Sequence, residues 1–485
     1  MAALDSTIIA TLVVPISNSF QSFSAMSWLA SGYLIANAAC QPLSGRLTDI
    51  FSRRSGLLFS NVFFGIGTLI CGLATNAGMM ILGRVVAGIG GGGLVAISTF
   101  VASDLIPLRR RGLWQGIGNI FWGLGSGLGG LVGGWVNDVW GWRWAFLIQV
   151  PLIIASGLLV FFRVKVPPVT NAQVPSIKRV DFLGAFTLVS ALVILLLGLN
   201  VAGNTLPWTH PLVFTTLALS PILFSIFIYV EEKVASEPII PVRLFLDRTI
   251  ASACLVTWLN TMATFSLIFY GPLYFQVVIG LTPTGSGVRL IPQSLGTAIG
   301  SLGAGLILRA TGKYYWLNVA IEALFVLACG TMCTLALHTP AWLPFIYFGL
   351  SGICYGGMLT VNLSALIAAL DHTHQAVVTS ASYMFRSTGA TIGITVASSI
   401  FQNLLKFQLF AHLGDRENAE EIIARIRRNV EEVKLLPDDW KVPILESYMA
   451  ALRGVFFFCL GLSVLAFALG LAMREHKLHG SLSRK

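Results

Sequence analysis

Long apolar blocks, separated by short polar connections, recur along almost the whole chain. Many of them approach or exceed the ~20 residues that a helix needs to cross a bilayer. A water-soluble chain of this length would instead form several domains with alternating polar and apolar faces. The pattern predicts an all-α polytopic membrane protein with fourteen transmembrane helices, centred near residues 10, 35, 66, 90, 124, 152, 191, 221, 260, 298, 326, 353, 387 and 463.

Composition and the placement of charge support this prediction and orient the helices. The 485 residues are 55% hydrophobic and 11% charged, with a mean hydropathy of +0.79. The net charge of +10 would suit a nucleic-acid partner, but nineteen Lys and Arg fall in connections on one side of the membrane and only two in the short connections on the other. Because cytosolic loops are enriched in positive residues, we expect both termini in the cytosol, a lipid bilayer around the helices and no nucleic-acid partner.

The order of the spans predicts two six-helix halves with two extra helices between them. Residues 1–165 form the first half and 249–473 the second, whereas 166–248 hold the extra helices with their flanking cytosolic loops. Residues 474–485 are a cytosolic tail.

The first span is unusually short. Its apolar stretch runs from Met1 to about Ile16, which is too short to cross a bilayer unaided. We therefore expect the natural chain to begin earlier, with a cytosolic tail and the first turns of this helix.

The segment 403–453 is the one sizeable piece expected outside the membrane. Within it Ile422 and Ile426 recur at helical spacing, and Glu421 pairs with Arg425 four residues later. We expect an amphipathic helix on the non-cytosolic surface. This helix either forms a solvated cap over the mouth of the protein or gates the entry of substrate.

No motif indicates an enzyme, a metal site or a cofactor. The seven cysteines lie in apolar runs, where they behave as small hydrophobic residues, and no HExxH, GxSxG or His/Cys cluster occurs. The GxGxxG spacing at 88–93 and 125–130 lacks the preceding strand that dinucleotide binding requires. Glycine at every fourth position allows close approach of helices instead.

The segment GRLTDIFSRR at 45–54 contains four charged residues and lies between two apolar blocks. Residues 305–313 in the second half have a similar spacing of glycine and charged positions. The segment resembles the loop motif G-x-L-x-D-x-x-G-R-[KR] of the major facilitator superfamily, with Ser52 where glycine is usual. The stretch from Arg84 to Gly91 resembles the fourth-span motif of the same superfamily.

Further motifs resemble the fourteen-span drug:proton antiporter branch of this superfamily. The segment LDSTI at 4–8 is similar to the first-span signature of the branch, and GWRW at 141–144 and YGPLYFQ at 270–276 are also branch-like. The antiporter motif of the fifth span is matched by Gly125, Gly129, Gly130, Gly133 and Gly134, with Gly130 in place of the usual proline.

The resemblance implies a cytosolic latch made of Gly45, Asp49, Arg53 and Arg54, which closes the cytosolic face and parts when the protein opens inward. A short turn lets Asp49 lie near a helix end while the arginines reach carboxylates or carbonyl groups of neighbouring helices. The alternative is that these arginines only orient the protein in the membrane.

Four ionisable residues fall at membrane depth: Asp5, Arg84, Glu322 and Arg386. Each costs at least ~2.5 kcal/mol at a helix centre, so each should face a cavity or a partner. Asp5 and Glu322 are the candidate proton- or cation-binding groups, because a carboxylate in a wet cavity can exchange a proton between two sides. Arg84 and Arg386 are expected to line the same pathway, where they bond helices or hold the charge of a carboxylate.

The resemblance implies a monomeric secondary transporter that exchanges protons for a small solute. Residues 375–389 and TDIF at 48–51 look most like fungal vacuolar basic amino acid transporters, and two buried carboxylates suit a cationic substrate. Export of drugs or toxic metabolites at the plasma membrane is the alternative within the branch. A membrane receptor or scaffold, which is a different class, would not need carboxylates at membrane depth.

Overall fold

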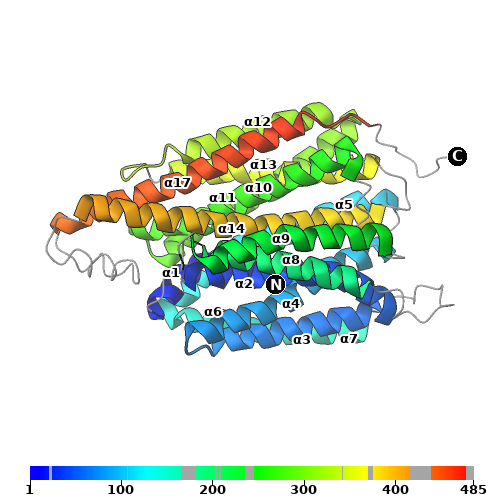
Figure 1. Ribbon diagram of the computed structural model, residues 1–485, viewed down its shortest axis with the longest axis horizontal. Helices are drawn as coiled ribbons and strands as arrows, with labels where there is room; N and C mark the ends of the chain where they lie inside the picture. Colours follow the sequence, from blue (N-terminus) through cyan, green and yellow to red (C-terminus); the bar gives the residue numbers. More distant parts are fainter. Residues whose placement is uncertain are drawn as a thin grey trace.

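The chain folds into a bundle of long helices that lie side by side along the long axis of the molecule (Figure 1). The computed structural model describes residues 1–20, 25–105, 108–164, 181–202, 206, 209–234, 245–340, 342–369, 375–413 and 438–476. Within these ranges the regular structure is helical and no β-strand occurs. The predicted all-α fold is therefore confirmed.

Each of the fourteen predicted centres lies in a long helix. The helices are α1 (Ala2–Ser19), α2 (Ala25–Phe51), α3 (Arg53–Gly72), α4 (Ala77–Leu105), α5 (Leu108–Trp140), α6 (Trp142–Leu147), α7 (Gln149–Arg163), α8 (Phe182–Val201), α9 (Pro211–Tyr229), η2 (Val230–Val234), α10 (Arg248–Leu273), η4 (Tyr274–Val278), α11 (Pro283–Thr311), α12 (Tyr315–Met332), α13 (Leu343–Ala368), α14 (Gln375–Leu413) and α17 (Asp438–Gly470). Helices α6 and α7 together form one span. Eleven of the described spans are long and apolar enough to cross a membrane, and α2, α5 and α14 are the three other long helices.

The helices form two groups that meet along a seam. Helices α1–α7 pack mainly on one another, as do α10–α17, and the groups meet where α5 lies against α11 and α2 against α14. Helices α8 and α9 pair with each other, and α8 contacts α2 and α14 beside the seam. Large apolar side chains such as Phe186 and Phe214 are exposed on this outer pair, as a surface that faces lipid requires.

Glycines of α5 allow this helix to lie close to both groups. A Cβ atom added to Gly129 would stand 2.3 Å from the carbonyl oxygen of Leu4 in α1, and one added to Gly134 would stand 2.7 Å from the carbonyl oxygen of Pro283 in α11. Neither position has room for a side chain, so α5 packs closely against helices of both groups. Of the remaining glycines of the motif, Gly125 and Gly133 face α1, and Gly130 lies between Thr11 of α1 and Gly287 of α11.

The described ends of the segment 403–453 are continuations of two long helices. Helix α14 extends to Leu413 and α17 begins at Asp438, and both project beyond the other helices at the left of Figure 1. The His412 Nδ1 atom lies 2.9 Å from the Ser447 hydroxyl and links the two projections. The residues expected to form an amphipathic helix, including Ile422 and Arg425, lie outside the described ranges.

The first helix continues beyond the predicted end of its apolar stretch. Helix α1 runs from Ala2 to Ser19, over 18 residues, and includes Pro15. An α-helix rises ~1.5 Å per residue, so α1 is about 27 Å long. Figure 1 places the first residue of the chain midway along the bundle.

Candidate functional site

Asp5 of α1 and Arg84 of α4 form a buried ion pair. The Arg84 Nη1 atom lies 2.6 Å from the Asp5 Oδ2 atom, and both side chains are only 1% exposed. Arg84 also donates from Nε to the Leu29 carbonyl oxygen at 3.1 Å, and its guanidinium lies over the Tyr33 ring, 4.4 Å from the centroid. The first carboxylate is thus neutralised by a cation that three helices hold in place.

Glu322 of α12 has a different partner. It is fully buried, and the Asn260 amide of α10 donates from Nδ2 to both carboxylate oxygens, at 2.9 and 2.8 Å. Among the described residues it pairs with no Lys, Arg or His. Asn318, one turn earlier on α12, is also buried, and neither atom of its amide has a described hydrogen-bond partner. The second carboxylate is thus held by neutral groups alone.

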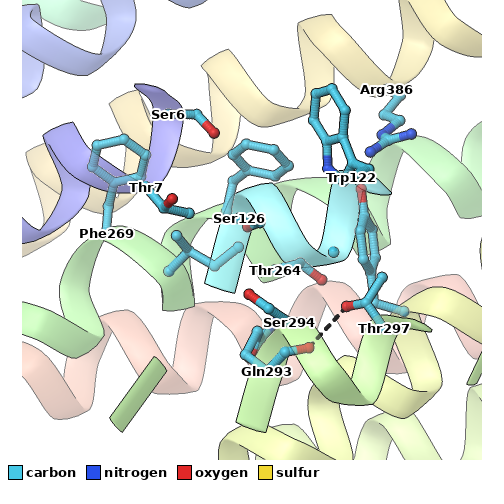
Figure 2. A pocket seen from close by; sticks show the side chains of 14 residues that line it. Ser6, Thr7, Trp122, Ser126, Thr264, Phe269, Gln293, Ser294, Thr297 and Arg386 are labelled. Atoms are coloured by element: carbon cyan, nitrogen blue, oxygen red, sulfur yellow. Dashed lines mark hydrogen bonds between the residues drawn. The ribbon is translucent and has the colours of Figure 1, made fainter. Parts of the chain in front are cut away.

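A cavity lies on the seam between the two groups of helices (Figure 2). Its volume is about 30 Å³, and it is open on one side. Its lining combines hydroxyl groups, one amide, aromatic rings and one charged side chain. The described lining residues are Ser6, Thr7, Trp122, Gly123, Ser126, Thr264, Phe265, Ile268, Phe269, Gln293, Ser294, Thr297, Tyr355 and Arg386.

Arg386 of α14 supplies the charge of this cavity. Its guanidinium carbon lies 5.5 Å from the centroid of the Trp122 ring and 5.9 Å from that of the Tyr355 ring, and Figure 2 shows it beside Trp122. Neither Asp5 nor Glu322 belongs to the described lining. The four intramembrane charges therefore fall into three places: an ion pair in the first half, a carboxylate in the second, and an arginine on the seam.

Several polar residues of this region carried no prediction from the sequence. Thr264, Gln293 and Tyr355 each line the cavity and each have a buried polar atom without a described hydrogen-bond partner. Asn260, which donates a hydrogen bond to Glu322, also carried no prediction from the sequence. A signal was present, since single polar residues inside apolar spans usually face a partner or a cavity.

Arg53 and Arg54 of the expected latch make contacts within the first half. Arg53 donates from Nη1 to the Thr48 hydroxyl at 2.8 Å. Arg54 donates from Nη2 to the Phe161 carbonyl oxygen at 2.5 Å, and its guanidinium lies 4.7 Å from the centroid of that ring. Gly45 and Asp49 lie in α2 at positions whose contacts the structure does not describe, so the contacts of these two latch residues stay a prediction.

Ser52, between α2 and α3, has the backbone conformation of a glycine. Its φ of 122° and ψ of 149° fall in a region that only glycine adopts readily, and among the described residues it is the one non-glycine with positive φ. This is the position where the loop motif usually has glycine. The Ser52 hydroxyl compensates in part, because it accepts a hydrogen bond from the Ser55 N–H at the start of α3.

Polar contacts join the two groups of helices where α5 ends and α11 begins. Gln276 of η4 donates to the Thr11 carbonyl oxygen of α1 at 3.0 Å. The Thr284 hydroxyl of α11 bonds the Asp138 carboxylate of α5. These two contacts tie the two groups of helices together at this end of the seam.

Comparisons with known proteins identify the fold and the family. The model of the "Major Facilitator Superfamily" matches residues 1–394. The chain is 36% identical to "Multidrug resistance protein fnx1" of Schizosaccharomyces pombe, over 100% of this chain and 92% of that protein. It is 33% identical to "Vacuolar membrane amino acid uptake transporter fnx2" of the same organism, over 99% and 83%, and 31% identical to "Vacuolar basic amino acid transporter 2" of Saccharomyces cerevisiae, over 91% and 96%.

A solved structure shares the arrangement of the helices. A bacterial homologue of the human lysosomal transporter Spinster, in an inward-facing and unoccupied conformation, superposes with a TM-score of 0.66 at 15% identity, over 100% of this chain and 96% of that one. The chain is a multi-pass membrane transporter and belongs to the major facilitator superfamily.

Proposed function

We propose that the protein is a proton-coupled antiporter that carries amino acids, in the first place basic ones, from the cytosol into the vacuole. The cavity on the seam is the observation that carries this proposal. It lies between helices of both groups, and ligand sites occur preferentially at such junctions. Hydroxyl, amide and guanidinium groups there suit a solute with several polar groups, and two of the relatives are named as vacuolar amino acid transporters.

Glu322 is the proposed proton carrier. A buried carboxylate without a cation is costly to ionise, and an arriving proton removes that cost. The Asn260 Oδ1 atom has no described hydrogen-bond partner. A half-turn of the Asn260 amide would present Oδ1, which accepts a hydrogen bond from a protonated carboxyl group but not from a carboxylate. The Asn260 amide would therefore have one orientation beside the charged carboxylate of Glu322 and the opposite orientation beside its protonated form.

Helix α10 connects this carboxyl group with the cavity. Asn260 holds Glu322, and Thr264 lines the cavity one helical turn further along α10. A change in the Asn260 hydrogen bond therefore acts on a helix that also forms the cavity wall. Protonation from an acidic lumen would release the solute there, and loss of the proton to the cytosol would reset the site.

Asp5 is the second proposed proton site, and it works differently. The Arg84 Nη1 atom lies 2.6 Å from the Asp5 carboxylate, so a proton on Asp5 would leave the Arg84 charge without its partner. Asp5 therefore takes part in coupling only if the ion pair opens during transport.

The latch made of Gly45, Asp49, Arg53 and Arg54 is proposed to close the cytosolic face. Arg54 already ties the α2–α3 turn to α7 through Phe161. Asp49→Ala should bias the protein towards the inward-facing state, because one contact of the closed state is lost. Labelling of a cysteine on the cytosolic side should then increase and turnover should fall, whereas equal labelling of both proteins would reduce the cluster to a topology signal.

Efflux of drugs or toxic metabolites at the plasma membrane is the second candidate function. Four aromatic residues in the cavity lining favour it, since flat apolar solutes stack on such rings. The relative named as a multidrug resistance protein also supports it. The carrier of the proton would be the same in both functions.

Vacuolar vesicles test the proposal. Vesicles from cells that make the protein should accumulate labelled lysine or arginine when energised, and collapse of the proton gradient should abolish the accumulation. Vesicles from cells without the protein are the control. Equal accumulation in both, together with drug resistance of the cells that make the protein, would favour the efflux function.

A further inference from the structure

The cavity on the seam contains a positive charge that has no negative partner among the described lining residues. Arg386 lines it, its described contacts are the faces of two aromatic rings, and no Asp or Glu belongs to the described lining. Ring faces leave the guanidinium N–H groups, which point out in the plane of the group, free to donate. An uncompensated cation at this depth is expensive, so a group that supplies negative charge would bind here with a large gain.

Tyr355 of α13 extends this positive group. Its ring lies 5.9 Å from the Arg386 guanidinium carbon, its side chain is 5% exposed, and its hydroxyl has no described hydrogen-bond partner. A buried hydroxyl without a partner costs free energy that a bound acceptor would recover. A phenol hydroxyl beside a guanidinium is a suitable pair of donors for the two oxygens of one carboxylate.

Gln293 of α11 adds a donor elsewhere in the same cavity. The Ser351 hydroxyl lies 2.7 Å from the Gln293 Oε1 atom, so the oxygen side of the amide is occupied. The Nε2 atom of this 3% exposed side chain has no described partner. Figure 2 shows Gln293 together with Thr264 on the side of the cavity away from Arg386. These groups are available to the remainder of a bound solute.

We propose that Arg386 and Tyr355 bind the carboxylate group of the transported solute, so that amino acids are recognised by their carboxylate rather than by a positive side chain. The proposal deepens the amino acid transport proposed above and rests on it for the identity of the solute. It differs from the expectation that buried carboxylates attract a cation, because Asp5 is occupied by Arg84 and Glu322 stands outside the lining. A basic side chain, which can only donate, would lie away from Arg386, towards hydroxyl oxygens such as that of Thr264.

Decarboxylated amino acids provide the sharpest comparison. Cadaverine is lysine without its carboxylate and retains both amino groups. Unlabelled lysine should inhibit uptake of labelled lysine. The cadaverine concentration that gives the same inhibition should be about 10- to 100-fold higher, because cadaverine lacks one charge-assisted hydrogen-bonded contact. Inhibition by cadaverine at the same concentration as lysine would overturn the proposal.

Substitutions of Arg386 locate the effect. Arg386→Gln should raise the KM for lysine by a similar factor and remove the preference over cadaverine, and Arg386→Lys, which keeps the charge, should restore part of that preference. Arg289→Gln is the matched control, because Arg289 also lies over two aromatic rings, those of Phe275 and Phe345, but does not line the cavity. The control should keep both the KM and the preference. Retention of both by Arg386→Gln would contradict the proposal.

Binding to purified protein separates this proposal from the one on transport. A ligand that binds the folded state raises the temperature of unfolding. Lysine should stabilise the wild-type protein more than cadaverine does, and this difference should vanish in Arg386→Gln. Stabilisation specific to lysine without uptake by vesicles would reject amino acid transport and retain the subsite. Equal stabilisation by both compounds, or none by lysine, would reject the subsite.

Discussion

The two carboxylates buried in the membrane have different partners. Asp5 and Glu322 are both fully buried, one in each half, and each is held by a neighbouring helix. Asp5 has a guanidinium group at 2.6 Å, whereas Glu322 has a neutral amide at 2.8 Å. Burial alone therefore does not define the role of an intramembrane carboxylate. The partner decides whether its charge is compensated by the protein or has to be compensated by a proton.

This difference assigns different tasks to the two halves. The Asp5–Arg84 pair connects α1 with α4, and Arg84 adds a bond to α2, so it stabilises the first half. The Glu322–Asn260 contact connects α12 with α10 through two hydrogen bonds from a neutral amide. We expect the first contact to determine stability and the second to determine coupling.

The largest effect on stability is expected when the ion pair is broken. Arg84→Ala leaves the Asp5 charge buried and alone, which should lower the free energy of unfolding by about 3–5 kcal/mol. Unfolding of the purified protein by denaturant measures this change. The double variant Asp5→Asn with Arg84→Gln removes both charges and should recover much of the loss. A single variant as stable as the wild type would show that the pair is not a structural contact.

An intermediate effect is expected at the neutral contact. Asn260→Ala removes the donor to Glu322 and should cost about 1–3 kcal/mol, because a buried acceptor loses its partner. It should also reduce gradient-driven uptake relative to solute exchange. Asn362→Ala is the control, since Asn362 donates to Thr257 at 3.0 Å and makes no described bond to Glu322. If both variants changed uptake and exchange alike, Asn260 would have no special part in coupling.

The smallest effect is expected at Ser52, away from both carboxylates. Ser52→Gly relieves a φ of 122° and loses only a weak helix cap, so it should raise the free energy of unfolding by about 1 kcal/mol. The variant separates stability from coupling, because the ratio of uptake to exchange should stay at the wild-type value. A lower free energy of unfolding would show that the Ser52 hydroxyl cap stabilises the protein by more than the backbone strain at Ser52 destabilises it.

The sequence predicted the helices well because the bilayer imposes a simple requirement on length and hydropathy. Every predicted span centre falls in a helix, and the charges at Asp5, Arg84, Glu322 and Arg386 stand out because such residues are rare in membranes. The extension of α14 to Leu413 was missed, since polar residues after about 402 indicate the end of a membrane span but not the end of a helix.

The partners of these charges could not be predicted. Asp5 and Arg84 are 79 positions apart, and Glu322 and Asn260 are 62 apart, so only the packing of the helices brings them together. The place of Arg386 in the cavity depends on which face α14 turns to the seam. The many polar residues of α14 are distributed around the helix, so they do not mark that face. The cavity itself arises from helices of both halves, and no local pattern encodes it.

Proton-driven accumulation by Glu322→Gln tests the central claim most directly. Purified protein in lipid vesicles would be measured in two ways: lysine exchange without a pH gradient, and lysine accumulation with one. Glutamine keeps an oxygen that accepts from Asn260 but cannot carry the proton. The account predicts that exchange persists and accumulation is lost. Accumulation at the wild-type level in Glu322→Gln would contradict the assignment of Glu322 as the proton carrier.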